Sequence, residues 1–467
     1  MTTPYSFPHS AYCAALRDTY DFLGAGDESG VSVNVAGRVM LLRTQGRLAF
    51  ATMRDSTGEI QLFALSSATE RFEDFAKLHL GDWVGVTGEV VRTKRGELSV
   101  KVSTWTVLAE ARRNFGDKWA GIADFDLRYR HREADLWANE SSRTSLARRS
   151  ALMRSIRERC WASQFMEVET PILNAVPSGA YARPFVTYHN ALGSEFYLRI
   201  APELWLKRLV VGGFERVFEL GRIFRNEGVS PRHNPEFTTL ELYAAYWDYD
   251  DMMAFTEELI AGAARDVLGT TEITYQGRPF SFATPWPRRT MAELASEAVG
   301  EEVSVHTPRE RLAALLVERD VEALDAWGPG RCLAELFEVA CEESLWDPVF
   351  VIDHPVEVSP LARRHRGDPE LTERFESYAV GREISNGFSE LNDPDDQRRR
   401  FEEQAKLGAA GDLEAMQIDE DYIKALEWGL PPTAGLGVGI DRLAMLIADV
   451  ANIREVIAFP TLKPVRD

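Results

Sequence analysis

The feature that most constrains the fold is a pair of alternating segments in the middle of the chain, joined by a loop. Residues 217–227 alternate between two faces, as expected of a strand, whose successive side chains point to opposite sides of a sheet. A loop with Gly228, Pro231 and Pro235 follows, and the alternation resumes over residues 237–246. The pattern predicts an antiparallel hairpin with a long loop.

One face of this hairpin carries charge. Arg225 and Glu227 share that face on the first segment, and Glu241 and Tyr243 form a matching pair on the second. Charged groups are costly to bury without partners, so this face is not an ordinary hydrophobic core. A solvent-facing sheet with surface ion pairs is one explanation, because antiparallel sheets often have one solvated face.

The loop of the hairpin favours a different explanation. Arg232, His233 and Asn234 follow one another there. Such side chains are donors for anionic oxygens, and the planar guanidinium of arginine is especially suited to phosphate. We therefore also consider a phosphate site at this end of the hairpin.

A second polar segment, residues 381–393, also alternates. By parity Glu383 lies on one face, whereas Asn386 and Glu390 lie on the other; Glu376 comes one short segment earlier. Two carboxylates on adjoining strands suit a hard divalent cation such as Mg²⁺, which typically bridges phosphates. Exposed surface charge is the alternative.

Residues 435–450 contain three glycines at alternate positions, followed by Arg442. The run superficially resembles a dinucleotide-binding fingerprint, but the spacing differs and no βαβ unit accompanies it. The segment instead indicates a glycine-lined strand that enters a helix. Glycines let a flat ligand approach the backbone, and an arginine plane can stack on an aromatic base.

Three regions of the chain differ in their residue pattern and in the secondary structure that it predicts. Residues 31–110 contain five short alternating segments with one helical interruption at 69–78, which predicts a small closed barrel. Such barrels often bind oligonucleotides but also host unrelated functions. Residues 111–145 are strongly charged and read as a linker that becomes helical; residues 145–165 have helical spacing, and residues 167–173 look like a strand.

Composition excludes several classes of protein. With 53 Lys and Arg against 73 Asp and Glu, the net charge of −20 argues against coating nucleic acid with the whole surface. The four cysteines have neither CxxC spacing nor a histidine cluster, so neither zinc nor a disulfide framework is indicated. No secretory signal is apparent, and charges interrupt the longest apolar stretch. We expect a cytoplasmic protein with no membrane segment.

Several stretches together resemble the class II aminoacyl-tRNA synthetases. FRNEG in the hairpin resembles their motif 2, GLGVGIDR resembles motif 3, and FMEVETPIL resembles the end of motif 1. PSGAYARPFVTYHNAL, YLRIAPELWLKRLVVGGFERVFELGRIFRNEG, VSPLARRH, GREISNGFSELND and LPPTAGLGVGIDR narrow the resemblance to the lysyl-tRNA synthetases. The match runs from about Val31 to Pro464, with gaps mainly near residues 275–330.

This resemblance implies an α+β protein: an N-terminal OB-type five-stranded β-barrel plus a class II synthetase catalytic domain, an antiparallel sheet flanked by helices. The expected boundaries are a short helical extension over residues 1–30, an anticodon-binding barrel over 31–110, a linker over 111–145 and the catalytic domain over 146–467. The implied reaction joins L-lysine and ATP, with Mg²⁺, into lysyl-adenylate and pyrophosphate. Lysine then passes to the 3′-terminal ribose of tRNA(Lys), in a homodimer formed partly through motif 1.

The resemblance also implies a set of nucleotide-binding residues. Arg225 would hold the α-phosphate, Glu227 the adenine amino group, and Arg442 would stack on the adenine ring opposite Phe237. The residues assigned to ATP are Arg225, Glu227, Arg232, His233, Phe237 and Arg442, of which Arg225 and Arg442 are the expected catalytic residues. Glu376 and Glu383 would bind Mg²⁺.

For lysine, Glu203 and the backbone of Gly179 would bind the α-amino group, and Asn386 and Arg225 the carboxylate. The ε-ammonium group would be surrounded by acidic and aromatic side chains, because a buried ammonium needs acidic partners. The residues assigned to lysine are Gly179, Glu203, Arg225, Glu241, Tyr243, Asn386, Phe388 and Glu390.

In the barrel, Phe50, Gln61 and Glu97 match the anticodon-contacting positions of the family. Phe50 would stack on a base, and the other two would contact base edges. Two alternatives stay open here: Phe50 as part of the barrel core, and Glu97 as a surface residue at a hairpin tip.

The chain departs from the family pattern at few positions. Glu133 and Ala134 stand where tyrosine and leucine are usual, and Gln164 stands where glycine is usual. The main rival function is a synthetase-like lysyl transferase with an acceptor other than tRNA. An aspartyl or asparaginyl enzyme would need a cationic amino-acid pocket. A non-catalytic binding module would not need to retain Arg225, Glu227, Glu383 and Arg442 together.

Overall fold

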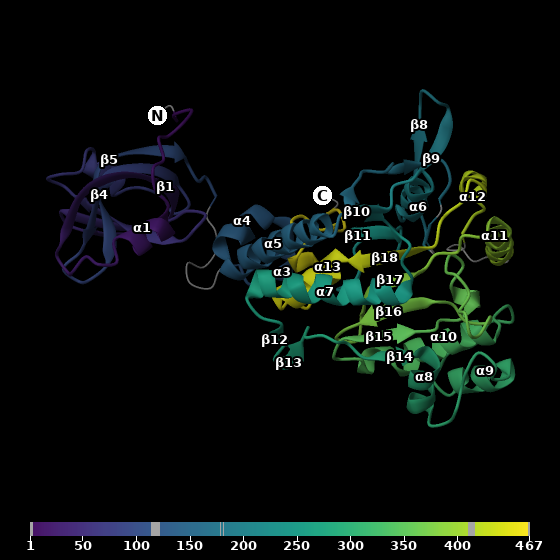
Figure 1. Ribbon diagram of the computed structural model, residues 1–467. Coiled ribbons are helices and arrows are strands. Elements are labelled where there is room, and N and C mark those ends of the chain that lie inside the picture. Colours follow the sequence, from purple (N-terminus) through teal and green to yellow (C-terminus); the bar gives the residue numbers. More distant parts are fainter. Residues whose placement is uncertain (1–2, 114–121, 178, 181, 410–415, 466–467) are drawn as a thin grey trace. The chain divides into compact units, whose positions relative to one another are not determined.

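The computed structural model describes residues 3–113, 122–177, 179–180, 182–409 and 416–465. It divides into two compact units, Met1–Asp124 and Phe125–Asp467. Figure 1 labels the helices and strands of both units. Part of the expected linker, residues 114–121, lies outside the described residues.

The first unit is a closed barrel with strand order β1-β2-β3-β5-β4. The strand β2 (Leu48–Arg54) and its neighbour β3 (Glu59–Leu65) alternate strictly between buried and half-buried residues, so every second side chain enters the core. The other elements of this unit are α1 (Cys13–Thr19), β1 (Glu28–Gln45), α2 (Phe72–Phe75), β4 (Trp83–Arg92) and β5 (Leu98–Ala109). The prediction of a five-stranded barrel with one short helix is confirmed.

The second unit is built on an eight-stranded sheet of order β14-β15-β16-β17-β18-β11-β10-β6. Most neighbours are antiparallel; β14 with β15 and β10 with β6 are parallel. The strands are β6 (Met166–Glu167), β10 (Arg216–Phe224), β11 (Glu236–Ala245), β14 (Arg288–Thr290), β15 (Val349–Ile352), β16 (Arg374–Tyr378), β17 (Glu383–Ser389) and β18 (Thr433–Gly439).

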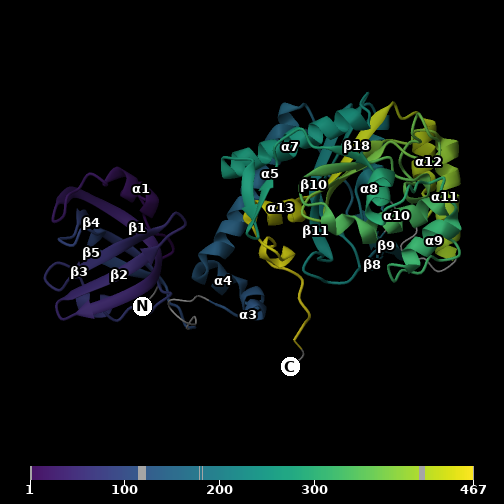
Figure 2. The same ribbon diagram turned by 90° about the horizontal axis from the view of Figure 1, so that it is seen from below.

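Helices cover this sheet because both of its faces carry apolar side chains. On β10 and β11 the even-numbered residues, such as Phe218 and Leu240, join the core formed with the helices α5 (Glu140–Ala162), α7 (Tyr249–Leu268) and α13 (Ile440–Ala448). The odd-numbered residues, such as Val217 and Tyr243, join a second core with α6 (Glu203–Val211), α11 (Pro394–Ala409) and α12 (Glu420–Glu427). Figure 2 shows α5, α7 and α13 beside one another.

A third core lies at the β14 end of the sheet. It is formed by α8 (Met291–Val299), α9 (Arg309–Val317) and α10 (Pro329–Ala340). The remaining elements are α3 (Phe125–Arg130), α4 (Arg132–Ala138), β7 (Leu173–Asn174), β8 (Val186–His189), β9 (Ser194–Leu198), β12 (Glu272–Tyr275), β13 (Arg278–Ser281), and the 3-10 helices η1 (Glu342–Ser344), η2 (Val356–Val358) and η3 (Ile453–Glu455). No helix among the described residues has the length and apolar character needed to cross a membrane.

The predicted hairpin is β10 with β11, and its register pairs Glu219 with Glu241. The first strand ends at Phe224, however, and not at Glu227 as the alternation indicated. Arg225 N donates to Pro235 O at 2.9 Å, and the ladder stops there because proline has no N–H to continue it. Arg225 and Glu227 therefore lie at the start of the loop.

Two other details differ from expectation. The strand predicted over 167–173 is wrong in extent: β6 covers Met166–Glu167 at the sheet edge, and β7 begins only at Leu173. Gln164, at the family's usual glycine position, has a φ of 64°. This left-handed conformation favours glycine, so glutamine at this position makes the turn after α5 locally strained.

Candidate functional site

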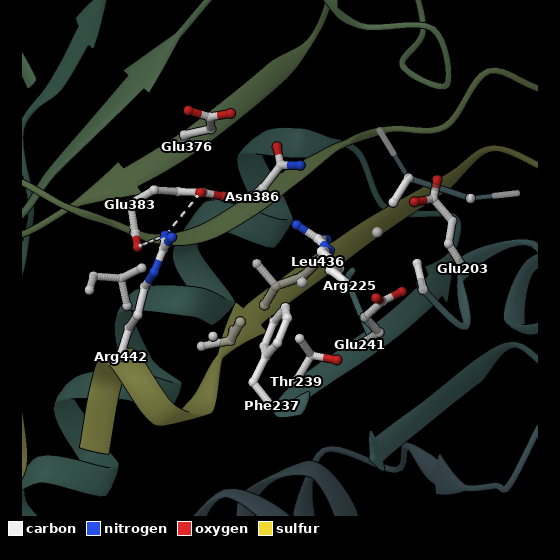
Figure 3. Close-up of a pocket in the computed structure, with 18 of the residues that line it drawn as sticks. Glu203, Arg225, Phe237, Thr239, Glu241, Glu376, Glu383, Asn386, Leu436 and Arg442 are labelled. Atoms are coloured by element: carbon white, nitrogen blue, oxygen red, sulfur yellow. Dashed lines mark hydrogen bonds and ion pairs between the residues drawn. The ribbon is translucent and has the colours of Figure 1, made fainter. Parts of the chain in front are cut away.

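A cavity of about 400 Å³ opens on the eight-stranded sheet. Its walls come from β11, β17 and β18, the hairpin loop and residues 358–362. In Figure 3, Glu203 and Glu241 lie toward one end, Glu376, Glu383 and Arg442 toward the other, and Arg225 between them. A cavity of this size is within the range that holds a small-molecule ligand.

The floor of the cavity is the glycine-lined strand β18. Gly435, Gly437 and Gly439 all line the cavity, and β18 continues directly into α13, which carries Arg442 in its first turn. The predicted glycine strand that enters a helix is thus present. A Cβ atom at Gly435 would overlap the Glu390 carboxylate and the Tyr243 ring, so a larger residue there would change the pocket.

The hairpin loop and α13 place several cationic groups together. The Arg442 guanidinium donates to Glu383 O at 2.8 Å and lies 3.3 Å from His233 Nε2. Partial burial, together with the guanidinium groups of Arg442, Arg232 and Arg225, lowers the pKa of His233. The Arg232 guanidinium makes no hydrogen bond or ion pair with any residue that the structure describes. This end of the cavity can therefore accept a polyanion.

Arg225 lies in the middle of the cavity. Its guanidinium is 5.4 Å from the centre of the Phe237 ring, and its buried Nε atom lacks a hydrogen-bond partner among the described residues. A buried donor without a partner is costly, so Arg225 is prepared to bind an acceptor from a ligand. Glu227 lines the same cavity but is exposed.

Glu376 and Glu383 both line the cavity, although parity placed Glu383 on the face opposite Asn386. That parity prediction is wrong because the register between β16 and β17 shifts next to Ile384, which turns Glu383 to the cavity side. Glu376 accepts hydrogen bonds from Arg374 at 2.5 Å and Tyr378 at 2.6 Å.

More acidic side chains lie nearby. Burial, with the carboxylates of Glu338 and Glu383 next in importance, raises the pKa of Glu342 to about 7. Burial also raises the pKa of Glu338. Among the described residues no three His, Cys, Asp or Glu side chains form a metal-holding cluster. The acidic surroundings fit a divalent cation that takes its remaining ligands from phosphate and water.

The other end of the cavity is strongly acidic. Glu241 forms no ion pair with any described residue, and its side chain accepts a hydrogen bond from the Tyr243 hydroxyl at 3.3 Å. Burial, and then the charge of Glu203, raises the pKa of Glu241 to about 8. A buried carboxyl group is favoured in its ionised form only beside a cation, so this end of the cavity suits a positively charged ligand.

Glu390 lies deeper than the cavity lining and is 1% exposed. It forms an ion pair with Lys207, which also donates to Glu203 at 2.6 Å. Lys207 was not predicted as a site residue. Glu203 and Lys207 are four residues apart on one helix, which places them on the same face. This spacing is the sequence feature that could have identified Lys207 as a partner of the predicted site residue Glu203.

The other predicted lysine-binding residues also lie around the cavity. Gly179, Asn386 and Phe388 line it. Asn386 Oδ1 accepts from Arg374 Nε at 3.0 Å, so Arg374 connects Asn386 to Glu376 and is a second residue that the sequence interpretation missed.

In the barrel, Phe50 and Gln61 point outward on neighbouring strands. Phe50 is half-buried and stacks on Phe63, with ring centres 5.1 Å apart, so the alternative that Phe50 belongs to the core is wrong. Gln61 accepts from Ser99 at 2.9 Å, and the exposed Glu97 carboxylate is 3.4 Å from Arg17. Phe63 adds a second ring to the aromatic surface that Phe50 forms. It lies two residues from Gln61 on the same strand, so alternation alone predicts that both side chains point outward.

Comparisons with known proteins agree with this architecture. The family model described as tRNA synthetases class II (D, K and N) matches residues 124–463, and an OB-fold nucleic acid binding domain matches residues 33–108. A lysine–tRNA ligase from Synechococcus sp. (strain CC9605) is 53% identical over 99% of this chain and 94% of its own length. The lysine–tRNA ligases of Synechococcus sp. (strain RCC307) and Nostoc punctiforme are 52% and 49% identical, over 99% of this chain and 93% and 85% of their own lengths.

Proposed function

The chain belongs to the lysine–tRNA ligases of the class II tRNA synthetases, and we propose that its cavity joins L-lysine to ATP and passes the lysyl group to tRNA(Lys). The observation that carries the choice of lysine is the charge of the acidic end. Glu203, Glu241 and Glu390 supply three carboxylates, whereas Lys207 is the ammonium group that pairs with two of them.

The charges of lysine complement this arrangement. When all three carboxyl groups are ionised, as a bound ammonium group would favour, three carboxylates less one ammonium leave a charge of −2, and L-lysine brings an α-ammonium and an ε-ammonium group. We assign Glu203, with the backbone of Gly179, to the α-ammonium, and Glu241, Tyr243 and Glu390 to the ε-ammonium. Phe388 lines the path of the aliphatic stem. An aspartate side chain would add negative charge to a site that already has an excess.

The α-carboxylate of lysine is assigned to Arg225 and Asn386, and the α-phosphate of ATP to Arg225. An oxygen of the carboxylate attacks the α-phosphorus, the bond to the bridging oxygen breaks, and pyrophosphate leaves. A carboxylate needs no general base, so positioning and charge neutralisation accelerate the step. We assign adenine to the space between Phe237 and Arg442, its amino group to Glu227, and the terminal phosphates to Arg232 and His233.

We assign Mg²⁺ to Glu376 and Glu383. Their acidic neighbours and the raised pKa of Glu342 support the assignment of a divalent cation there. When bound, Mg²⁺ would neutralise phosphate oxygens; Glu376 is held for this by Arg374 and Tyr378.

For the barrel we propose anticodon binding on the outward face that carries Phe50, Gln61 and Glu97. The stacked pair of Phe50 and Phe63 supports base stacking. On family membership we further propose a homodimer, a cytoplasmic location and the domain limits given above.

The test is exchange of labelled pyrophosphate into ATP by the purified protein. We expect exchange that depends on lysine and on Mg²⁺. No exchange with lysine, or equal exchange with aspartate, would reject the proposal. Charging of a tRNA(Lys) transcript then tests the second step.

A further inference from the structure

Lys207 is a buried cation that the proposed reaction does not use directly. It lies on α6, is 0% exposed, and is absent from the lining of the cavity. Its ammonium group contacts Glu203 at 2.6 Å on one side and forms an ion pair with Glu390 on the other. Burying an ammonium group is costly, so its presence here needs an explanation beyond packing.

Three aromatic rings complete the surroundings of this ammonium group. Its Nζ atom lies 5.3 Å from the ring centre of Phe388, 5.8 Å from that of Tyr243 and 5.9 Å from that of Tyr422. Rings at such distances attract a cation through their negative faces. Lys207 is therefore held in one place, and with it the two carboxylates that it contacts.

Glu390 depends on this contact. Neither of its carboxylate oxygens accepts a well-formed hydrogen bond from the described residues, and the side chain is fully buried. One oxygen is directed at Gly435, which lines the cavity. Burial raises the pKa of Glu390 well above its usual value, and the charge of Lys207 is the largest influence that lowers it. Loss of that charge would therefore shift this carboxyl group further toward the protonated form.

We propose that Lys207 is a positioning residue that favours the ionised form of Glu390 and holds this side chain toward the ε-ammonium group of bound lysine. This inference rests on the proposed function. Lys207 thereby sets the selectivity of the pocket for an amino acid with a charged end. It acts through Glu390 for the ε-ammonium group, whereas its contact with Glu203 concerns the α-ammonium group, which every amino acid has.

The experiment compares L-lysine with L-norleucine, which has the same chain but no ε-ammonium group. Pyrophosphate exchange gives kcat/KM for each amino acid in the wild type, in Lys207→Met and in a control, Arg208→Met. Arg208 is the next residue on α6; its guanidinium packs on the Trp205 ring and forms no ion pair with any described residue. The ratio of the two kcat/KM values cancels effects on the shared α-amino end and on overall folding.

We expect Lys207→Met to lower the lysine-to-norleucine ratio by about 10- to 100-fold, the range for losing one charge-assisted hydrogen bond. The KM for ATP should stay within about twofold, and Arg208→Met should keep the wild-type ratio. An unchanged ratio in Lys207→Met would overturn the inference while leaving the lysine activity intact. Absence of lysine-dependent exchange in the wild type would instead reject the proposed function.

Lys207→Met leaves two buried carboxylates unpaired, so its fold must be checked by circular dichroism and thermal melting. If it does not fold, the double variant Lys207→Met/Glu390→Gln is compared with Glu390→Gln alone. Because Lys207 acts on selectivity through Glu390, the two should have the same lysine-to-norleucine ratio within about twofold. A further large loss of selectivity in the double variant would overturn the inference.

Discussion

At the scale of single residues, the most informative group is the Glu241 carboxylate. Burial, and next the charge of Glu203, raises its pKa to about 8 in the free protein. At pH 7 this carboxyl group is therefore mostly protonated, and a bound ammonium group would favour its ionised form. Lysine binding should then release a proton.

This release makes affinity depend on pH. Between pH 7 and pH 9 the ionised fraction of a group with a pKa of 8 grows by about tenfold, so the Kd for lysine should fall by up to about that factor. Calorimetry in buffers with different ionisation enthalpies measures both the Kd and the protons released. Glu241→Gln should bind lysine weakly and remove the proton release; release that persists unchanged in this variant would contradict the assignment.

At the scale of elements, β18 depends on having no side chain at Gly435. A Cβ atom there would overlap Glu390 and Tyr243, whereas a Cβ atom at Gly437 would meet nothing closer than 3.8 Å. We expect Gly435→Ala to lower the free energy of unfolding by about 1–3 kcal/mol, as overpacking does, and Gly437→Ala to change it little. Chemical denaturation without ligands measures both; equal stability of the two variants would contradict this account of the floor.

Another element-scale prediction concerns the turn after α5. Gln164 has a φ of 64°, whereas Ser163 has a φ of −88°. Gln164→Gly should raise the free energy of unfolding by about 0.5–1 kcal/mol by relieving the left-handed strain, and the control Ser163→Gly should lower it by a similar amount. Melting temperatures check the sign, and a loss of stability in Gln164→Gly would show that the side chain has a packing role.

The sequence predicts the features that depend on neighbouring residues, and it fails for those that depend on residues distant in the chain. Alternation identified the hairpin β10–β11 and the barrel strands, because it reports which face a side chain takes. It misplaced Glu383, because a register shift of one residue reverses the parity beyond it. The pairing of Lys207 with Glu390 joins residues distant in the chain, and no local pattern carries that information.

At the scale of the whole molecule, the chain divides its proposed tasks between two units, Met1–Asp124 and Phe125–Asp467. The cavity belongs to the second, and the outward stack of Phe50 on Phe63 belongs to the first. Lysine activation and tRNA recognition should therefore respond separately to mutation.

Phe50→Ala removes one ring of that stack without entering the barrel core, so the barrel should stay folded. We expect kcat/KM for charging of tRNA(Lys) to fall by about 10- to 100-fold, the effect of losing one base stack, while pyrophosphate exchange stays within about twofold. Phe22→Ala, which removes a 77% exposed ring elsewhere in the same unit, is the matched control and should leave both activities unchanged. Equal losses in charging and exchange would show that the barrel face acts through the catalytic unit rather than on the anticodon, because base stacking on Phe50 has no part in forming the adenylate.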